Sequence, residues 1–245
     1  MSSAAGTGAV AGPQQEQKAE KRAAAQRAAG LIRSGMIVGL GTGSTAGFAL
    51  TSLAGRLADG KLAALAGIPT SEKVANEARR LGIPLTSLDE HPVIDLTIDG
   101  ADEVDPDWNL IKGGGGALLR EKIIAQASRR EVIVIDHTKR SPRLGTQHSV
   151  PVEVARFGWR PEALHLEALG ATVSLRRGKD GSPFRTDQGN LILDAGFGPI
   201  DDIAGLAASL LARAGVAEVG LFSGLTTDLV TATPSGVDHQ ERPRR

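Results

Sequence analysis

The carboxylates of Asp99, Asp102 and Glu121, the ammonium group of Lys112 and a run of four glycines lie within residues 99–121 of this 245-residue chain. Asp99 and Asp102 follow an apolar, largely β-branched run, Val93 to Ile98, which is typical of a buried strand. Lys112 precedes the glycines, and Glu121 lies in the helix-forming residues after them. Because parallel α/β sheets bind ligands at the carboxyl ends of their strands, the pattern favours a site where these groups converge on one small polar molecule.

Glu121 has apolar neighbours on its side of the predicted helix. The residues three or four positions away are Ala117, Leu118, Ile124 and Ala125. A carboxylate among such neighbours loses hydration, which raises its pKa and suits it to act as a general base or acid near neutral pH. The spacing fits equally well a surface glutamate paired with an adjacent arginine or lysine. Asp99 and Asp102 also fit turn and cap positions.

Two glycine-containing loops are candidates for contact with an anion. Gly113 to Gly116 precede the helix predicted for residues 117–127, and such a run favours close approach of a ligand to unpaired backbone N–H groups. Gly41 to Gly47 lie between a strand predicted over residues 36–40 and a helix predicted over residues 48–57. Hydroxyl donors, exposed N–H groups and the positive end of a helix make this second loop a phosphate cradle.

A loose dinucleotide pattern, Gly41, Gly43 and Ala46, is an alternative interpretation of the second loop. A dinucleotide site requires an acidic residue at the end of the next strand. The strand predicted over residues 63–68 ends instead in Pro69-Thr70-Ser71, which caps the following helix. This argues against NAD.

The segments DGADEVD and NLIKGGGGALLREKIIA closely resemble the signature of the A-type ribose-5-phosphate isomerase family, and GTGST and IPTS are similar to it as well. The resemblance implies interconversion of an aldose phosphate and a ketose phosphate through an enediol, with no metal and no cofactor. It assigns the proton-shuttling base to Glu121, stabilisation of negative charge on oxygen to Lys112, and sugar contact with ring opening to Asp99 and Asp102.

The resemblance also implies a set of substrate-contacting residues: Thr42, Gly43, Ser44, Thr45, Gly100, Ala101, Gly113, Gly114, Gly115 and Lys139. Lys21 falls where the family often has a phosphate-contacting lysine, although a lysine on a solvated helix face is the more frequent explanation. The partner implied is a small phosphosugar. Members of the family form dimers or tetramers, so a homodimer or homotetramer is expected.

The order of predicted elements indicates an α/β protein with a doubly wound, mostly parallel, Rossmann-like sheet and a smaller ferredoxin-like α+β domain. The first domain is expected to comprise residues 18–144 and 220–238. Residues 145–219 follow the order β-α-β-β-α-β and are interpreted as a lid or oligomerisation domain. Residues 1–17 are expected to be a disordered tail, and residues 239–245 a charged tail.

Composition excludes several classes of protein. The 28 basic and 28 acidic residues balance, so neither a nucleic acid nor an acidic membrane surface is an expected partner. Cysteine is absent, and the five histidines are scattered without metal-ligand spacing. The sequence has no long apolar run or apolar signal core, and we expect a cytoplasmic protein.

The preferred hypothesis is an isomerase of ribose 5-phosphate and ribulose 5-phosphate, an activity of the non-oxidative pentose phosphate pathway. A sugar-phosphate deaminase-isomerase would need a histidine in the central stretch, and none is present there. A CoA transferase would use a glutamate as its nucleophile, which Glu121 alone does not exclude. A non-catalytic sugar-phosphate sensor would be expected to carry a DNA-binding domain or to lack the base.

Overall fold

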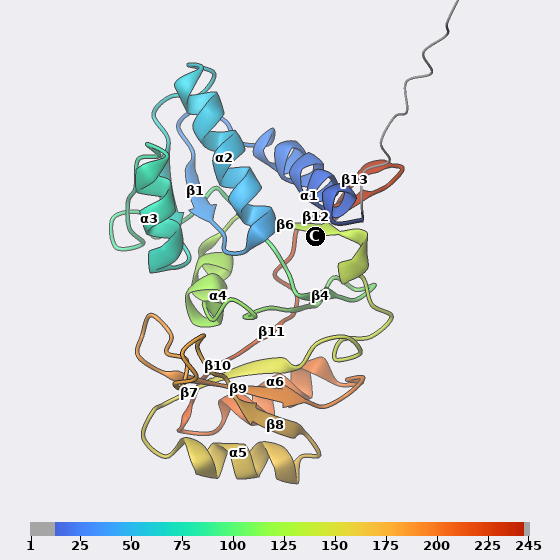
Figure 1. Cartoon of the computed structure of the whole chain (residues 1–245). Coiled ribbons are helices and arrows are strands. Elements are labelled where there is room, and N and C mark those ends of the chain that lie inside the picture. The colour runs from blue at the N-terminus through green and yellow to red at the C-terminus, as the bar shows by residue number, and fades with distance from the viewer. Residues whose placement is uncertain (1–12, 243–245) are drawn as a thin grey trace, which may run out of the picture.

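The computed structural model describes residues 13–242, which form two stacked parts with the chain passing between them (Figure 1). The upper part contains α1 to α3 and a large sheet, and the lower part contains a smaller sheet with α5 and α6. No helix within residues 13–242 is long and apolar enough to cross a membrane.

The large sheet has the strand order β13-β12-β6-β3-β1-β2, and all neighbours are parallel except β12 and β13. Its strands are β1 (Ile37–Leu40), β2 (Ala66–Pro69), β3 (Leu96–Asp99), β6 (Glu131–Asp136), β12 (Asp228–Thr233) and β13 (Gly236–Glu241). The mostly parallel order confirms the doubly wound α/β fold predicted from the sequence.

Helices cover both faces of this sheet because its central strands are apolar on both sides. On β6, Val132 and Val134 belong to a core shared with α1 (Pro13–Ala29), α2 (Ser44–Ala58) and α3 (Glu72–Arg80). Ile133 and Ile135 face the other side, with Phe222 and Leu229. On this other side α4 (Leu118–Ala127) packs Ile124 against Ile68 and Ile94.

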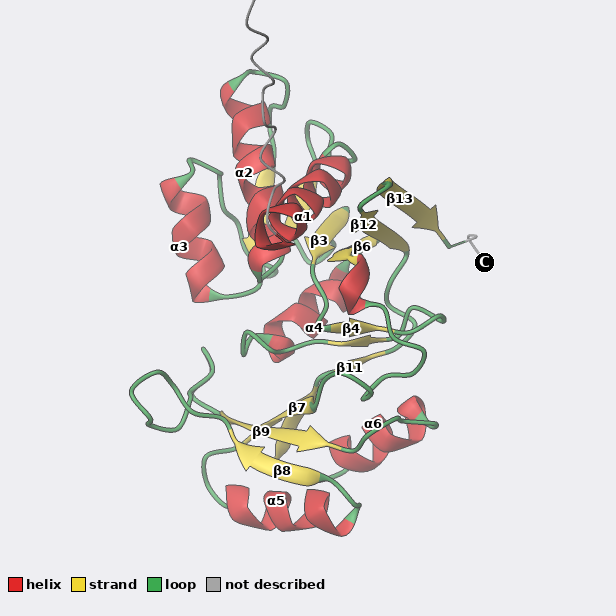
Figure 2. Ribbon diagram, turned by 45° about the vertical axis from the view of Figure 1, so that its right-hand side comes forward, coloured by secondary structure: helices red, strands yellow, loops and turns green. Residues whose placement is uncertain are grey.

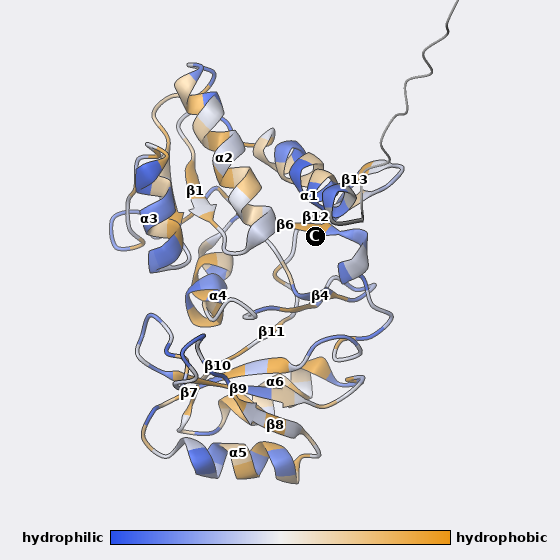
Figure 3. Cartoon of the chain, viewed as in Figure 1, coloured by the Kyte–Doolittle hydropathy of each residue, from blue (hydrophilic) through white to orange (hydrophobic). Residues whose placement is uncertain are grey.

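The smaller sheet is antiparallel, with the order β10-β7-β9-β8. Its elements follow the chain as β7 (Val150–Val154), α5 (Trp159–Ala168), β8 (Thr172–Leu175), β9 (Leu191–Gly196), α6 (Ile203–Leu211) and β10 (Val216–Val219). This β-α-β-β-α-β order confirms the second, ferredoxin-like domain. Figure 2 shows α5 and α6 beside the sheet, and Figure 3 shows that α5 carries both hydrophilic and hydrophobic residues.

A third, three-stranded sheet of β4 (Glu103–Val104), β5 (Leu110–Ile111) and β11 (Leu221–Phe222) lies between the two parts. Gly220 separates β10, in the smaller sheet, from β11, in this third sheet. The N–H of Gly220 donates to Pro151 O at 2.7 Å, and its carbonyl accepts from the N–H of Lys112 at 2.9 Å. A Cβ at Gly220 would lie 2.3 Å from Lys112 O, so the junction requires glycine.

Several boundaries differ from the predictions. Residues 13–17, expected in a disordered tail, belong to α1, because Pro is suited to the first turn of a helix and Gln and Glu favour helix formation. Residues 1–12 lie outside the described residues. Residues 239–241, expected in a charged tail, pair with β12 as part of β13, where His239 Nε2 contacts Asp228 Oδ1 at 3.0 Å.

Candidate active site

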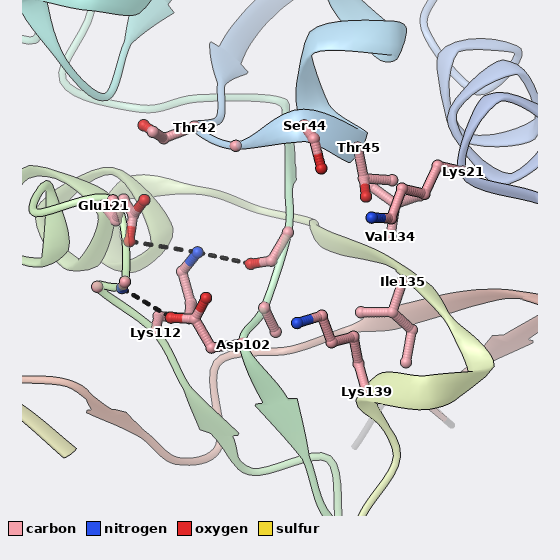
Figure 4. A pocket seen from close by; sticks show the side chains of 16 residues that line it. Lys21, Thr42, Ser44, Thr45, Asp102, Lys112, Glu121, Val134, Ile135 and Lys139 are labelled. Carbon is pink, nitrogen blue, oxygen red and sulfur yellow. Dashed lines mark hydrogen bonds and ion pairs between the residues drawn. The ribbon is translucent and has the colours of Figure 1, made fainter. Parts of the chain in front are cut away.

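A cavity of about 150 Å³ lies at the carboxyl ends of β1, β3 and β6, where parallel sheets bind ligands. The close-up in Figure 4 shows side chains entering it from several elements. Its walls are formed by Lys21, Thr42, Gly43, Ser44, Thr45, Gly100, Ala101, Asp102, Lys112, Gly113, Gly114, Gly115, Glu121, Val134, Ile135 and Lys139. The structure thus brings together, around one cavity, every predicted site residue except Asp99.

Lys112 is the centre of a buried charge cluster. Its side chain is 3% exposed, and its Nζ lies 3.0 Å from Asp99 Oδ2 and 3.3 Å from Glu121 Oε2. The ammonium group also donates to Gly100 O at 2.6 Å. Among the described residues, neither Asp99 Oδ2 nor Glu121 Oε2 has a hydrogen-bond donor of suitable geometry. The two carboxylate oxygens are therefore held chiefly by the charge of Lys112.

Burial and neighbouring charge shift the pKa values in this cluster. Burial raises the pKa of Glu121 to about 7; the Lys112 ammonium opposes this shift, and the Asp99 carboxylate adds to it. Burial disfavours the charged form of Lys112, but the carboxylates of Asp99 and Glu121 outweigh it and hold the pKa of that ammonium above its ordinary value. Glu121 is thus a group that can accept and return a proton near neutral pH, beside a lysine that remains positively charged.

The structure places Asp99 behind the cavity wall. It is fully buried at the end of β3, and its Oδ1 accepts hydrogen bonds from the N–H groups of Thr42 (3.0 Å) and Gly100 (2.7 Å). Its other oxygen faces Lys112. Asp99 therefore lies beneath Lys112, outside the residues that line the cavity, and the sugar contact that the resemblance implies for it stays a prediction.

Asp102 is the aspartate that lines the cavity. Its Oδ2 accepts a hydrogen bond from the N–H of Gly114 at 2.7 Å, and a Cβ at Gly114 would lie 2.7 Å from Oδ1. Glycine is therefore required at this position by the close approach of the carboxylate. The N–H groups of the glycine run are also less free than the sequence suggested, because the N–H of Gly116 donates to Gly113 O at 2.9 Å.

The opposite end of the cavity is positively charged and rich in hydroxyl groups. Ser44 and Thr45 form the first turn of α2, which begins at Ser44 and not near Phe48 as predicted. Figure 4 shows the ammonium groups of Lys21, from α1, and Lys139, from the 3₁₀ helix η1 (His137–Lys139), on the side of the cavity away from Glu121. Lys21 is half-buried, with its Nζ 3.7 Å from Asp136 Oδ2. A helix N-terminus with two lysines is suited to a phosphate group.

Three features of the site were not predicted. Val134 and Ile135 of β6 line the cavity, although the apolar sequence of this strand gives no indication that it touches a ligand. Thr70 Oγ1 lies 2.6 Å from Thr42 Oγ1 and holds the loop before α2. Asp136, at the end of β6, caps η1 by accepting from the N–H of Thr138 at 3.1 Å. An acidic residue that ends a strand before a polar turn was the available signal for this cap.

One group of potential metal ligands occurs within residues 13–242, on β12 and β13, away from the cavity: Asp228, His239 and Glu241. No spacing in the sequence predicts this group, since the three residues meet only through the pairing of β12 with β13. The guanidinium of Arg130 already pairs with Asp228 and lies 3.3 Å from Glu241. This positive charge competes with a cation, so the group is best described as an ion-pair network.

Comparison with known proteins gives concordant matches. The profile of the ribose 5-phosphate isomerase A (phosphoriboisomerase A) family matches residues 66–236. The chain is 60% identical over 219 residues to the ribose-5-phosphate isomerase A of Chloroflexus aurantiacus, covering 89% of this chain and 92% of that protein. It is 52% identical to the same enzyme of Desulfatibacillum aliphaticivorans, covering 90% and 96%.

Solved structures agree with these sequence matches. A D-ribose-5-phosphate isomerase in complex with phospho-erythronic acid is 37% identical, with a TM-score of 0.90 over 92% of this chain and 99% of that one. The ribose 5-phosphate isomerase of Plasmodium falciparum is 36% identical, with a TM-score of 0.89 over 93% and 100%.

Proposed function

This chain belongs to the ribose 5-phosphate isomerase A family, and from that premise we propose that it interconverts D-ribose 5-phosphate and D-ribulose 5-phosphate through an enediol, as part of the non-oxidative pentose phosphate pathway. The observation that carries the proposal is the buried cluster in which the Lys112 ammonium lies between the carboxylates of Asp99 and Glu121, at the wall of the cavity. The cluster supplies the base and the cation that the reaction needs.

The proton transfer uses Glu121. Its carboxylate takes the proton from C2 of the open-chain aldose, the electron pair forms the C1–C2 double bond, and the C1 carbonyl oxygen becomes negatively charged. Glu121 then returns the proton to C1, while the proton of the C2 hydroxyl passes to the negatively charged oxygen on C1, so that C2 becomes the ketone and C1 carries a hydroxyl. Because one group performs both transfers, its pKa of about 7 keeps both protonation states accessible.

Lys112 stabilises the negative oxygen of the enediolate. Preorganised charges of this kind are usually the largest single contribution to catalysis, since they need no reorganisation during the reaction. Asp99 keeps Lys112 protonated and oriented from beneath, which gives it a supporting role without contact to the sugar. Asp102 lines the cavity, so ring opening, in which a proton leaves the C1 hydroxyl and the ring oxygen gains one, falls to Asp102.

The phosphate group binds at the other end of the cavity. Ser44 and Thr45 offer hydroxyl and N–H donors in the first turn of α2, and Lys21 and Lys139 supply positive charge. Thr42 and Gly43 place that turn, because the N–H of Thr42 is tied to Asp99 at 3.0 Å. This arrangement orients the sugar with C1 and C2 toward Glu121.

The test is turnover of ribose 5-phosphate by the purified protein in D₂O with excess chelator. The enediol route predicts ribulose 5-phosphate that carries deuterium at C1, because the shuttled proton exchanges with solvent on Glu121. Turnover without any deuterium over many cycles would contradict exchange at the carboxylate and favour direct hydride transfer. Binding of the sugar phosphate with no turnover would overturn the isomerase and favour a sensor.

A second test uses phospho-erythronic acid, the compound bound in the related solved isomerase. Its carboxylate is planar and carries two oxygens, which resembles the C1–C2 end of the enediolate. We expect competitive inhibition of this chain, with tighter binding than that of ribose 5-phosphate. Inhibition that is not competitive would contradict binding at the cavity.

Self-association is part of the proposal. On the small domain, Phe157 is 96% exposed and Leu164, on α5, is 65% exposed, and large apolar side chains so placed favour a protein–protein contact. Light scattering after size exclusion is expected to give a dimer or tetramer. A monomer at every protein concentration would contradict it.

A further inference from the structure

Arg176, a residue of the small domain, contacts the glycine run of the cavity. It directly follows β8, and its Nη1 donates to Gly113 O at 2.6 Å and to Gly114 O at 3.1 Å. Its own backbone is fixed on both sides, because its N–H donates to Ile192 O and its carbonyl accepts from the N–H of Phe184, each at 2.9 Å. The guanidinium therefore reaches the cavity wall from a well-anchored position.

The neighbouring strand holds the guanidinium in place. Arg176 Nε donates to Asp194 Oδ2 at 2.9 Å, and Nη2 pairs with Asp194 Oδ1. The side chains of Arg176 and Asp194 are only 15% and 25% exposed. A bidentate pair fixes the plane of an arginine, which leaves Nη1 directed at the glycine carbonyls. A lysine has no such fork and cannot serve both partners with the same geometry.

The contact acts on a single peptide unit. The carbonyl of Gly113 and the N–H of Gly114 belong to the same peptide group. The carbonyl accepts from Arg176 at 2.6 Å, and the N–H donates to Asp102 Oδ2 at 2.7 Å. Because a trans peptide points its C=O and N–H in opposite directions, the guanidinium and the Asp102 carboxylate hold this unit from its two ends. Rotation of the peptide would break both hydrogen bonds.

The small domain supports the glycine run at a second point. Gly116 has a φ of +83°, and a Cβ there would lie 2.4 Å from Cε1 of Phe184. Phe184 and Arg176 are paired across the same hairpin. The run is thus supported at both ends by one hairpin of the small domain.

We propose that Arg176 is a positioning residue, which reaches from the small domain to fix the Gly113–Gly114 peptide and thereby orients Asp102 for ring opening. The inference rests on the proposed function, since it assigns the step that Arg176 assists. Loss of its charge-assisted hydrogen bond is expected to lower kcat by about tenfold to a hundredfold. The KM is expected to change little, because Arg176 lies away from the phosphate end.

The first experiment compares Arg176→Gln with Arg177→Gln. Arg177 is a matched control, because it is the adjacent arginine, is exposed, and donates to Gly181 O within its own hairpin at 2.8 Å. We expect R176Q to lose kcat and R177Q to retain it. Equal kcat in R176Q and wild type, or equal losses in both variants, would overturn the proposal.

The second experiment does not depend on turnover. Amide exchange of Gly114, followed by NMR, is expected to be faster in R176Q than in wild type and unchanged in R177Q. Unchanged exchange in R176Q would overturn the proposal even if wild-type turnover is absent. If the wild type shows no turnover but Gly114 exchanges faster in R176Q, the proposed function is overturned, whereas the contact between Arg176 and the Gly113–Gly114 peptide is supported.

Two further variants guard against a simple loss of folding. Arg176→Lys retains the charge and the stem, and we expect its melting temperature to stay near that of wild type while kcat falls. In Arg176→Ala, millimolar guanidinium ion is expected to restore part of the lost kcat, which a merely structural defect would not permit. Failure of guanidinium to raise kcat, or unchanged kcat in R176K, would contradict a positioning role.

Discussion

The two ends of the cavity use lysines in different ways. At one end, Lys112 is 3% exposed and lies 3.0 and 3.3 Å from two carboxylates. At the other end, Lys21 is 19% exposed and lies 3.7 Å from Asp136, whose Oδ1 is engaged by Thr138. Lys139 is also partly exposed. Lys112 is already paired with neighbouring carboxylates, whereas the partly exposed Lys21 and Lys139 can form an ion pair with a ligand.

This difference is consistent with the role proposed for each end. Charge interactions are strong in a desolvated cluster and shift the pKa values of its members, as a proton transfer requires. A partly exposed end can bind a phosphate dianion and release it again, because water and salt screen the interaction. The comparison predicts that substitutions at the buried end change kcat or stability and that those at the exposed end change KM.

The largest expected effect is that of Glu121→Gln. Removal of the base should lower kcat by about 10²- to 10⁴-fold, with binding of ribose 5-phosphate retained in calorimetry. Glu167→Gln is a suitable control, since Glu167 is exposed on α5, and we expect it to behave as wild type. Near-normal kcat in E121Q would refute the assignment of the base and the contrast between the two ends.

Asp99→Asn and Asp102→Asn should separate the two aspartates. Removing one partner of a buried ion pair costs about 3–5 kcal/mol, so D99N should be markedly less stable in urea unfolding. D102N should keep nearly all of its stability and lose kcat, because Asp102 borders the cavity. The reverse result, a destabilised D102N and a stable D99N, would contradict the placement of Asp99 beneath Lys112.

Lys139→Ala tests the exposed end. Loss of a charged contact to phosphate should raise the KM for ribose 5-phosphate by about tenfold, with kcat nearly unchanged. Salt should raise the KM of wild type more than that of K139A, because one screened charge is missing. Lys179→Ala, an exposed lysine of the small domain, is the control. A tenfold loss of kcat in K139A would show that this end takes part in the chemistry.

The pH dependence of kcat should follow the ionisation of Glu121, at the buried end, and should not depend on the lysines at the other end. Glu121 must be ionised to accept a proton, and its pKa is raised to about 7, so kcat should fall as the pH drops below about 7. The pH at which kcat is half-maximal should be the same in K139A as in wild type. It should be lower in D99N, because the Asp99 carboxylate helps to raise the pKa of Glu121. An unperturbed midpoint near 4 to 5 in wild type would show that Glu121 is solvated.

Local patterns in the sequence were sufficient for many elements. The apolar, β-branched runs at residues 131–136 and 150–154 form β6 and β7 over those same residues. Ser71 caps α3 by accepting from the N–H of Val74 at 3.2 Å, as predicted from the residues after β2. Apolar runs, helix caps and glycines are recognised from residues adjacent in the sequence, so predicting these elements requires no knowledge of contacts between distant residues. The same signature segments also identified the family.

Contacts between residues far apart in the sequence could not be predicted from such local patterns. Asp99 and Asp102 are equivalent in type and close in sequence, yet burial places one behind Lys112 and the other on the cavity wall. Arg176 meets Gly113 only because the small sheet packs against the glycine run. The pKa of Glu121 likewise depends on the tertiary structure, because desolvation and the distances to charges are properties of the packed chain.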